Sequence, residues 1–336
     1  AVVCRTAQSF IRFGNFEILA ARKEYELLEQ LVRYTIATDF PHITGGSETD
    51  RILRWLAEVC EKTAKLIVDW MRVGFVHGVM NSDNMSILGL TIDYGPYGWL
   101  EGYDPTWTPN TTDAQSRRYC YGNQPYMAQW NLMQLANALY PLIKEEQPLQ
   151  EALDRYRLSF QSEWQQTLRA KLGLHSQEKN DDQLIASLLE LLTKAETDYT
   201  IFFRRLAQIT RSEKSGEKLL DTVSEAFYRP EEIEETHVSE VKSWLHRYRL
   251  RLTRDELSDA ERQEKMNRVN PKYVFRNYLA QQAIDKVEEG DYSMVEELLD
   301  LFRRPYDEQP DRSRFAAKRP EWARHKPGCS MLSCSS

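Results

Sequence analysis

The sequence predicts a mainly α-helical protein that carries one short β-hairpin. Apolar residues recur at helical spacing over most of the chain, which is typical of helices packed on a core. Two short apolar runs, Met85–Leu88 and Leu90–Ile92, flank Gly89 and predict the arms and the turn of the hairpin. With 336 residues, 41% of them hydrophobic, the chain can bury one large core or two smaller ones.

Two helices are predicted before the hairpin. Residues 16–37 place apolar side chains at roughly helical spacing, which predicts the first helix. Ser47 then offers an N-cap with Asp50 three residues later, and the helix behind it is predicted to run to about Val73. Gly74 follows directly and is expected to end this second helix.

The rest of the chain is predicted to be a long loop, a run of helices and a tail. Residues 94–125 are rich in Gly, Pro, Tyr and Asn, and a loop this long in a compact domain is usually functional or disordered. Pro271 is expected in the first turn of its helix, its favoured position, and the tail after Pro305 is expected to run extended over the surface. The helices are predicted at 127–144, 148–172, 181–196, 198–210, 214–227, 237–252, 257–267, 271–288 and 293–303.

Charge and composition argue against several classes of protein. The formal net charge is −7, whereas a nucleic-acid-binding protein is more often basic. No apolar run is long enough to cross a bilayer. The chain begins at Ala1 without a Met, which is expected of a fragment or a processed product.

The cysteines are odd in number and scattered, which argues against the disulfide framework of a small secreted protein. They are Cys4, Cys60, Cys120, Cys329 and Cys334. The sequence therefore predicts a reducing compartment. That compartment is the cytoplasm if the source is bacterial, and the mitochondrion or another organelle if it is eukaryotic.

The most informative stretch is His77–Pro96, HGVMNSDNMSILGLTIDYGP. A hairpin in its middle would make Asn84 and Asp93 neighbours, because the chain returns beside its starting point. An amide oxygen and a carboxylate side by side suit Mg²⁺, which takes oxygen ligands and retains several waters. The stretch resembles the catalytic loop and the Asp-Phe-Gly loop of protein kinases, in which an Asn and an Asp hold the magnesium ions on the nucleotide phosphates.

The stretch departs from the kinase pattern at the catalytic base. Kinases place the base Asp directly after His-Arg, and the corresponding residue here, Val79, cannot accept a proton. Asp83 is the nearest substitute, and His77 is expected to be a structural hydrogen-bonding residue rather than a catalytic one. A plain turn with two solvated carboxylates is disfavoured, because the His-Gly, Asp-Asn and Asp-Tyr-Gly pieces occur together and in order.

Further segments extend the resemblance over most of the chain. They are Cys4-Arg5, Ser9–Glu17, Asn123–Pro125, Trp130–Leu132, Asn270–Tyr273, Arg276–Gln282, Pro305–Asp307 and Cys334–Ser336. With these segments the chain resembles the SelO/YdiU family, kinase-like adenylyltransferases that include selenoprotein O. The resemblance implies a kinase-like C-lobe over residues 1–145, a helical extension over 146–304 and an extended tail over 305–336.

The resemblance also implies an activity and a set of site residues. Family members transfer AMP from ATP to Ser, Thr or Tyr hydroxyls of proteins, with Mg²⁺ (or Mn²⁺) as cofactor and ATP and proteins as partners. Asp83 matches the proton acceptor, Asn84 and Asp93 match the metal ligands, and Arg5, Arg12 and Asp93 match residues that contact the nucleotide. Guanidinium groups suit this role because they bind phosphate in a bidentate manner.

One half of the family's nucleotide site has no counterpart in this sequence. The Gly-rich phosphate loop, the strand lysine and its glutamate partner belong to an N-lobe that lies upstream of the region matching Ala1. This chain alone is therefore expected to lack a full nucleotide cradle. Two alternatives to AMP transfer stay open from the residues themselves: a phosphotransferase of the kinase type and a non-catalytic scaffold on a kinase fold.

The C-terminus carries a separate signal. Cys334 stands third from the end, where some relatives carry selenocysteine. The functional interpretation is a redox switch in which Cys334 bonds to a cysteine near the active site, and Cys120 is the obvious candidate. An unpaired terminal thiol is equally consistent with the sequence, because sequence alone does not show that two thiols meet.

Overall fold

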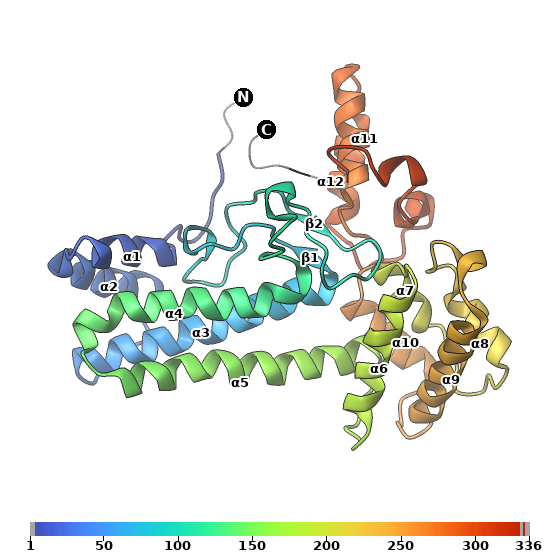
Figure 1. The fold of residues 1–336 in the computed structure, drawn as a ribbon, viewed down its shortest axis with the longest axis horizontal. Helices are drawn as coiled ribbons and strands as arrows, with labels where there is room; N and C mark the ends of the chain where they lie inside the picture. The colour runs from blue at the N-terminus through green and yellow to red at the C-terminus, as the bar shows by residue number, and fades with distance from the viewer. Residues whose placement is uncertain (1–3, 330–331, 333–336) are drawn as a thin grey trace. The chain divides into compact units, whose positions relative to one another are not determined.

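The computed structural model describes residues 4–329 and residue 332, and it is mainly helical (Figure 1). Within the described residues one sheet is present, in which β1 (Phe75–Val76) pairs antiparallel with β2 (Gly98–Trp99). The predicted fold class, mainly α with a small antiparallel β element, is confirmed.

The chain forms two compact units. The first consists of the described residues up to Asp69, His77–Gly95 and Gly122–Trp164. The second consists of Trp70–Val76, Pro96–Tyr121 and the described residues from Gln165 onward.

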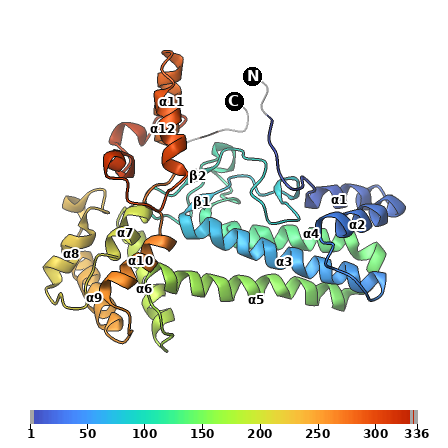
Figure 2. The same cartoon turned by 180° about the vertical axis from the view of Figure 1, so that it is seen from behind.

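The first unit is built on five helices, of which α3, α4 and α5 run side by side in both views (Figures 1 and 2). Their bounds are α1 (Phe13–Ala21), α2 (Tyr25–Asp39), α3 (Glu48–Val73), α4 (Gln124–Ile143) and α5 (Glu146–Lys171), and α3 and α5 continue into the second unit. Aromatic rings fill the core: Phe16 of α1 lies 5.2 Å from Trp55 of α3, centroid to centroid, and both are fully buried. The Tyr156 hydroxyl of α5 donates a hydrogen bond of 2.8 Å to the Pro125 carbonyl of α4.

The single helix predicted at residues 16–37 is wrong, because the chain breaks into α1 and α2. Lys23 adopts a left-handed conformation with φ +61°. Its N–H donates to the Ala20 carbonyl, and the next N–H, of Glu24, donates to the Leu19 carbonyl. These two bonds form the hydrogen-bonding pattern that usually ends a helix at glycine. Since lysine occupies the glycine position, the sequence carried no signal for the break.

The second predicted helix is confirmed as α3. The Ser47 hydroxyl accepts a hydrogen bond from the Asp50 N–H, and the Asp50 carboxylate accepts one from the Ser47 N–H. This reciprocal pair caps the helix. Gly74, with φ +77°, ends it in a backbone conformation that a side chain would strain.

The hairpin arms are misplaced in the sequence prediction. Residues 85–92 turn at Ser86–Gly89, where the Gly89 N–H donates to the Ser86 carbonyl, but they do not form paired strands. The strands are instead β1 and β2, which bracket the whole stretch from His77 to Tyr97. Ser86 forms a bridge with Arg12, far away in sequence. The N-terminal segment instead binds the Met85 carbonyl and the Ile87 N–H of the first arm.

The second unit contains seven further helices, close to the predicted ones. They are α6 (Asp181–Lys194), α7 (Tyr199–Leu206), α8 (Gly216–Ser224), α9 (Glu235–Leu252), α10 (Asp259–Val269), α11 (Asn277–Glu288) and α12 (Ser293–Phe302). The exception is Pro271, which lies outside any helix. The N–H groups of Lys272 and Tyr273 both donate to the Pro305 carbonyl, so the segment before α11 is held in a non-helical path.

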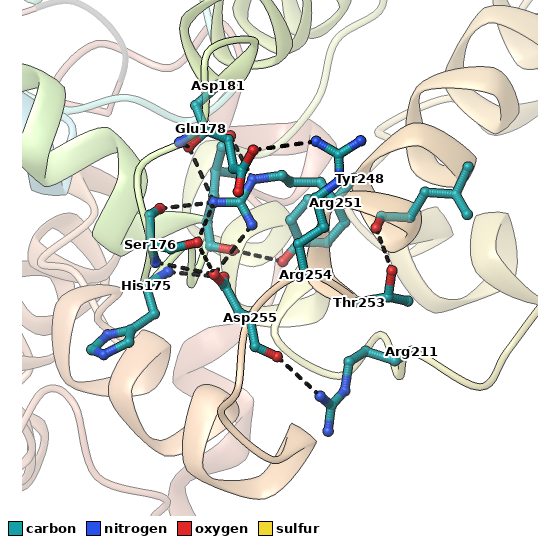
Figure 3. A network of polar contacts seen from close by, with 12 residues as sticks. His175, Ser176, Glu178, Asp181, Arg211, Tyr248, Arg251, Thr253, Arg254 and Asp255 are labelled. Carbon is teal, nitrogen blue, oxygen red and sulfur yellow. Dashed lines mark hydrogen bonds and ion pairs between the residues drawn. The ribbon is translucent and has the colours of Figure 1, made fainter.

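A buried ionic network joins α6 to α9 (Figure 3). Arg251 donates to both carboxylate oxygens of Asp181, at 2.6 and 3.1 Å, and to the Ser176 carbonyl at 2.7 Å. Asp255 accepts from the His175 and Ser176 N–H groups and from the Ser176 hydroxyl. Burial raises the pKa of Asp255, but these hydrogen bonds outweigh it and the net pKa is lowered. Removing one partner would leave a buried charge uncompensated.

The tail does not simply run over the surface, as the sequence suggested. Phe315, Ala323 and Cys329 are buried in the core formed with α11 and α12. Two short 3-10 helices, η5 (Pro310–Ala316) and η6 (Glu321–Ala323), carry the first two of these residues. The apolar side chains were spaced too irregularly among Arg, Lys and Pro to predict this burial from the sequence.

Candidate functional site

The N-terminal segment lies along the loop that carries the candidate residues. The Phe13 N–H donates to the Met85 carbonyl at 3.1 Å, and the Ile87 N–H donates to the Ile11 carbonyl at 3.3 Å. Arg12 lies between these two bonds. No local sequence pattern indicates this pairing, which places Arg12 beside a loop more than 70 residues later in the chain.

His77 is a structural residue of the loop. It is fully buried, and its Nε2 lies 2.9 Å from the Ile92 carbonyl, the residue before Asp93. Its Nδ1 accepts from the Val79 N–H, so Nε2 is the nitrogen that carries the proton and donates to Ile92. Burial lowers the pKa of His77 and favours this neutral form. These contacts support the structural role predicted for His77.

Two buried amides of α4 hold the same loop from the other side. The Gln124 Oε1 accepts from the His77 N–H at 3.1 Å, and the Asn131 Nδ2 donates to the Met80 carbonyl at 2.9 Å. Both side chains are fully buried. Because a backbone group that loses its buried partner costs about 1–3 kcal/mol, these amides stabilise the loop in one conformation.

Asp83 and Asn84 lie together in the short 3-10 helix η1 (Ser82–Asn84). Asp83 is exposed, and Asn84 donates from Nδ2 to the Val79 carbonyl at 2.9 Å. This bond orients the Asn84 amide, so that its oxygen is the atom left for a ligand. Val79, at the position of the kinase base, offers no proton acceptor.

Gly14, in the first turn of α1, lies directly against Asp83. A Cβ atom at Gly14 would be 2.0 Å from the Asp83 Oδ1 and 3.0 Å from its Cγ. No side chain fits in that space without moving the carboxylate. The sequence signal was a glycine in the first turn of a helix, where it weakens the helix unless close approach requires it.

Asp93 is bound by Arg12. The Arg12 Nε lies 2.5 Å from Asp93 Oδ2, and the Arg12 Nη2 lies 2.9 Å from Asp93 Oδ1, which is a bidentate ion pair. Asp93 itself has φ +52°, a left-handed conformation that is uncommon for a residue other than glycine and is often found at functional sites. The structure thus brings together a predicted metal ligand and a predicted nucleotide-binding arginine.

Arg12 interacts electrostatically with both candidate carboxylates, Asp93 and Asp83. The pKa of Arg12 is raised, first by the hydrogen bond to Asp93 and then by the charges of Asp93 and Asp83, against the opposing effect of burial. Arg12 therefore lies within electrostatic range of Asp83 as well as in contact with Asp93. The Arg12 guanidinium can therefore exchange its carboxylate partner for a phosphate group, because both are anions that it binds in the same way.

The second predicted arginine, Arg5, lies near the same place. Its guanidinium carbon is 4.5 Å from the centroid of the Tyr94 ring, a cation–π contact. Tyr94 follows Asp93 directly, so Arg5, Arg12 and Asp93 gather at one side of the loop. In the sequence, Tyr94 is the middle residue of the Asp-Tyr-Gly piece, and that position alone predicts no contact with Arg5.

The donor set fits a magnesium ion that arrives with a nucleotide. Within the described residues no group of three or more His, Cys, Asp or Glu side chains could hold a metal by itself. Asn84 and Asp93 supply one amide and one carboxylate, and Mg²⁺ in phosphate-transfer sites is commonly held by one or two protein oxygens with waters and substrate phosphates. The chemistry of these two residues suits that mode of binding.

The predicted redox residues lie partly outside the described chain. Cys120 is buried in the second unit. Cys334 lies outside the described residues, but Leu332 is described and forms a parallel bridge with Asn110. The Thr111 N–H donates to the Leu332 carbonyl at 2.8 Å, and the Leu332 N–H donates to the Pro109 carbonyl at 2.9 Å. At Leu332 the tail is thereby attached to the loop that contains Cys120.

Comparison with known proteins now identifies the family. A family model described as "Protein adenylyltransferase SelO" matches residues 1–303. The chain belongs to the SelO family. Curated relatives named protein nucleotidyltransferase YdiU support this. The chain is 56% identical to that of Rhodopirellula baltica, 55% to that of Aromatoleum aromaticum and 52% to that of Flavobacterium johnsoniae.

Each of these SelO relatives is longer than the chain. The alignments cover 100% of this chain but 65%, 63% and 64% of the three relatives, so the chain spans about two thirds of their length. In the part of the chain that the structure describes, no helix combines the length and apolar character needed to span a bilayer.

Replacement of Gly14 tests the contact with Asp83. In a full-length SelO protein carrying this chain, we expect Gly14→Ala to lower the transfer rate about 10²-fold, because a misplacement of about 1 Å at a reacting group has that effect. Thermal unfolding should change little, since the exposed Asp83 carboxylate can swing away. Gly216→Ala, in the first turn of α8 with no atom closer than 3.8 Å to the added Cβ, is the matched control. Equal activity of both variants would contradict the contact.

Proposed function

We propose that the protein of which this chain forms part transfers AMP from ATP to a hydroxyl group of a protein. The observation that carries the proposal is the convergence of Arg12, Asp83 and Asp93 on one loop. Membership of a family described as protein adenylyltransferase supports the same reaction. The proposal applies to the longer protein, because the chain covers about two thirds of its relatives.

The reaction is a displacement at the α-phosphorus of ATP. The acceptor oxygen forms a bond to that phosphorus, the bond to the bridging oxygen of the β-phosphate breaks, and pyrophosphate leaves with the electron pair. Asp83 accepts the proton of the hydroxyl, since Val79 cannot. Its exposure in η1 leaves the carboxylate open to a protein acceptor, and Gly14 keeps that side of it clear of side chains.

The remaining residues bind and orient the phosphates. Asn84 and Asp93 would hold Mg²⁺, which neutralises the charge on the phosphate oxygens when bound. Arg12 exchanges its carboxylate partner for a phosphate when the nucleotide enters, which releases Asp93 for the metal. Arg5, held over Tyr94, supplies a second guanidinium to the same phosphates.

Labelled ATP distinguishes the proposed reaction from its alternatives. With the full-length protein and a protein acceptor, label from α-³²P-ATP should stay on the acceptor, whereas label from γ-³²P-ATP should leave as pyrophosphate. Transfer of the γ-label instead would identify a phosphotransferase. Absence of transfer from either nucleotide, with the nucleotide still bound, would favour a non-catalytic scaffold.

We further propose that Cys120 and Cys334 form a reversible disulfide. The attachment of Leu332 to residues 109–111 supports this, because it holds the chain two residues before Cys334 against the loop of Cys120. Two thiols would lose two protons and two electrons to a disulfide oxidant such as oxidised glutathione. The bond would tie the tail to the segment that follows Asp93 in the chain, and we propose that this restraint lowers activity.

Oxidation should therefore lower AMP transfer, and dithiothreitol should restore it. Cys120→Ser should abolish this sensitivity, whereas Cys4→Ser, which removes an exposed thiol elsewhere, should leave it intact. Non-reducing peptide mapping of the oxidised full-length protein checks the pairing directly. Intermolecular pairing only, or the absence of a Cys120–Cys334 peptide, would show that the switch is wrong.

A further inference from the structure

An apolar groove of about 870 Å³ lies in the second unit, between α11, α12 and the segment before α11. Aromatic rings form its floor: Trp99 lies 5.7 Å from Tyr97 and 6.2 Å from Phe275, centroid to centroid. Tyr97 and Trp99 follow the Asp93–Gly95 segment closely, whereas the two helices form the walls. None of these residues belongs to the site described above.

Each wall presents an apolar stripe at helical spacing. On α12 the groove is lined at positions 295, 298, 299 and 302, and on α11 at 280, 283, 284 and 287, which in both helices is the i, i+3, i+4, i+7 pattern of one face. Ile284, Val295 and Leu299 are 50%, 44% and 60% exposed, although each is a large apolar residue. Single exposed apolar residues are ordinary, but three that line one groove mark an interaction surface.

The shape of the groove suits a third helix. Ala280 is a small, partly exposed residue of the α11 stripe, and a small side chain lets the backbone of another element approach closely. A helix that lies between two helices inserts its own i, i+3, i+4 and i+7 side chains into the space between them. Helices α11 and α12 therefore provide two helices of a three-helix arrangement, and the docked helix would be the third.

One end of the groove is acidic, because Glu288 of α11 lines it and further carboxylates lie nearby in the chain. Between Asp285 and Asp300 the chain carries seven carboxylates and one lysine. Several of these carboxylates are paired: Asp285 with Lys326, Asp291 with Lys286, Glu297 with Arg314 and Asp300 with Arg312. No ion pair within the described residues involves Glu288, Glu289 or Glu296, which lie at the end of α11 and the start of α12.

We propose that this groove docks an amphipathic helix of a partner protein, with lysine or arginine residues at the end that meets Glu288 and Glu296. Burial of the apolar face provides the affinity, and the carboxylates at the Glu288 end set the direction of the helix and speed its encounter. The same carboxylates disfavour an anionic membrane surface, which attracts basic rather than acidic patches. Occupation of the groove covers Tyr97 and Trp99 and so reaches the segment that follows Asp93.

A designed helical peptide tests the proposal on the full-length protein. The probe is a fluorescein-labelled peptide of about 18 residues, roughly 27 Å long as a helix, with leucines at i, i+3, i+4 and i+7 and lysines at one end. Fluorescence anisotropy should show saturable binding. A peptide with glutamates in place of the lysines should bind at least about tenfold more weakly, a difference of about 1.4 kcal/mol.

Variants of the groove separate specific docking from non-specific adhesion. Leu299→Glu should weaken binding at least about tenfold, whereas Leu158→Glu, a change of a similarly exposed leucine on α5, should not. Glu288→Lys combined with Glu296→Lys should reverse the preference, so that the acidic peptide binds better. Circular dichroism confirms that each variant is folded.

Three results would overturn the proposal. The first is that neither peptide binds to the full-length protein, which would mean that the groove is already covered within it. The second is that Leu158→Glu weakens binding as much as Leu299→Glu does. The third is a dimer in sedimentation equilibrium that Leu299→Glu dissociates, which would assign the groove to a second copy of the protein.

Discussion

Asp93→Ala in the full-length protein should lower AMP transfer by about 10²–10³-fold or more, the size of effect seen when one preorganised electrostatic contact to the reacting group is lost. Asp93 is the carboxylate that Arg12 holds in bidentate contact, and it is the one charged member of the proposed metal pair. Its loss removes the carboxylate proposed to bind the metal and leaves Arg12 without this ion-pair partner. Mg²⁺-dependent nucleotide affinity, measured by titration calorimetry, should fall together with the rate.

The fold should survive this substitution. Both side chains of the ion pair are about one third exposed, at 30% and 32%, so the pair contributes at most about 1 kcal/mol. Circular dichroism and thermal unfolding should therefore match those of the unmodified protein. Asp221→Ala, which removes an exposed carboxylate of α8, is the matched control and should keep full activity. Undiminished transfer by Asp93→Ala would show that the metal assignment is wrong.

Asp83→Asn should lower turnover by about 10²–10⁴-fold, the usual contribution of a general base. The amide keeps the shape of the side chain but does not take the proton of the acceptor hydroxyl. ATP affinity should change little, because the phosphates are assigned to Arg5, Arg12 and the metal pair. A loss in kcat without a loss in nucleotide binding is the expected signature.

Two other variants test whether the loss of turnover is specific to the Asp83 carboxylate. Gly14→Ala should reproduce part of the Asp83→Asn effect, since it moves the same carboxylate. Asp221→Asn should do nothing. If Asp83→Asn instead leaves turnover unchanged and abolishes ATP binding, then Asp83 is a nucleotide-binding residue and another group accepts the proton.

Local sequence determined much of the fold. The apolar spacing, the Ser47–Asp50 cap and Gly74 predicted α3 almost to the residue, because each acts within one or two helical turns. Most helices of the second unit followed from the same periodicity. The prediction failed at Lys23 and Pro271. A lysine in the glycine position of a helix end is not visible in the local sequence pattern. The same is true of the Pro305 carbonyl, which accepts hydrogen bonds from the Lys272 and Tyr273 N–H groups.

The candidate site likewise has a part that local sequence predicts and a part that depends on tertiary packing. The sequence alone predicted that Asp83, Asn84 and Asp93 share one loop, because their order and spacing are encoded within twenty residues. Only the tertiary structure decided what surrounds them: the Arg12 ion pair, the close approach of Gly14 and the amides of Gln124 and Asn131. Those contacts join residues from 47 to 81 positions apart. The distances between such residues depend on how the helices pack rather than on any local pattern.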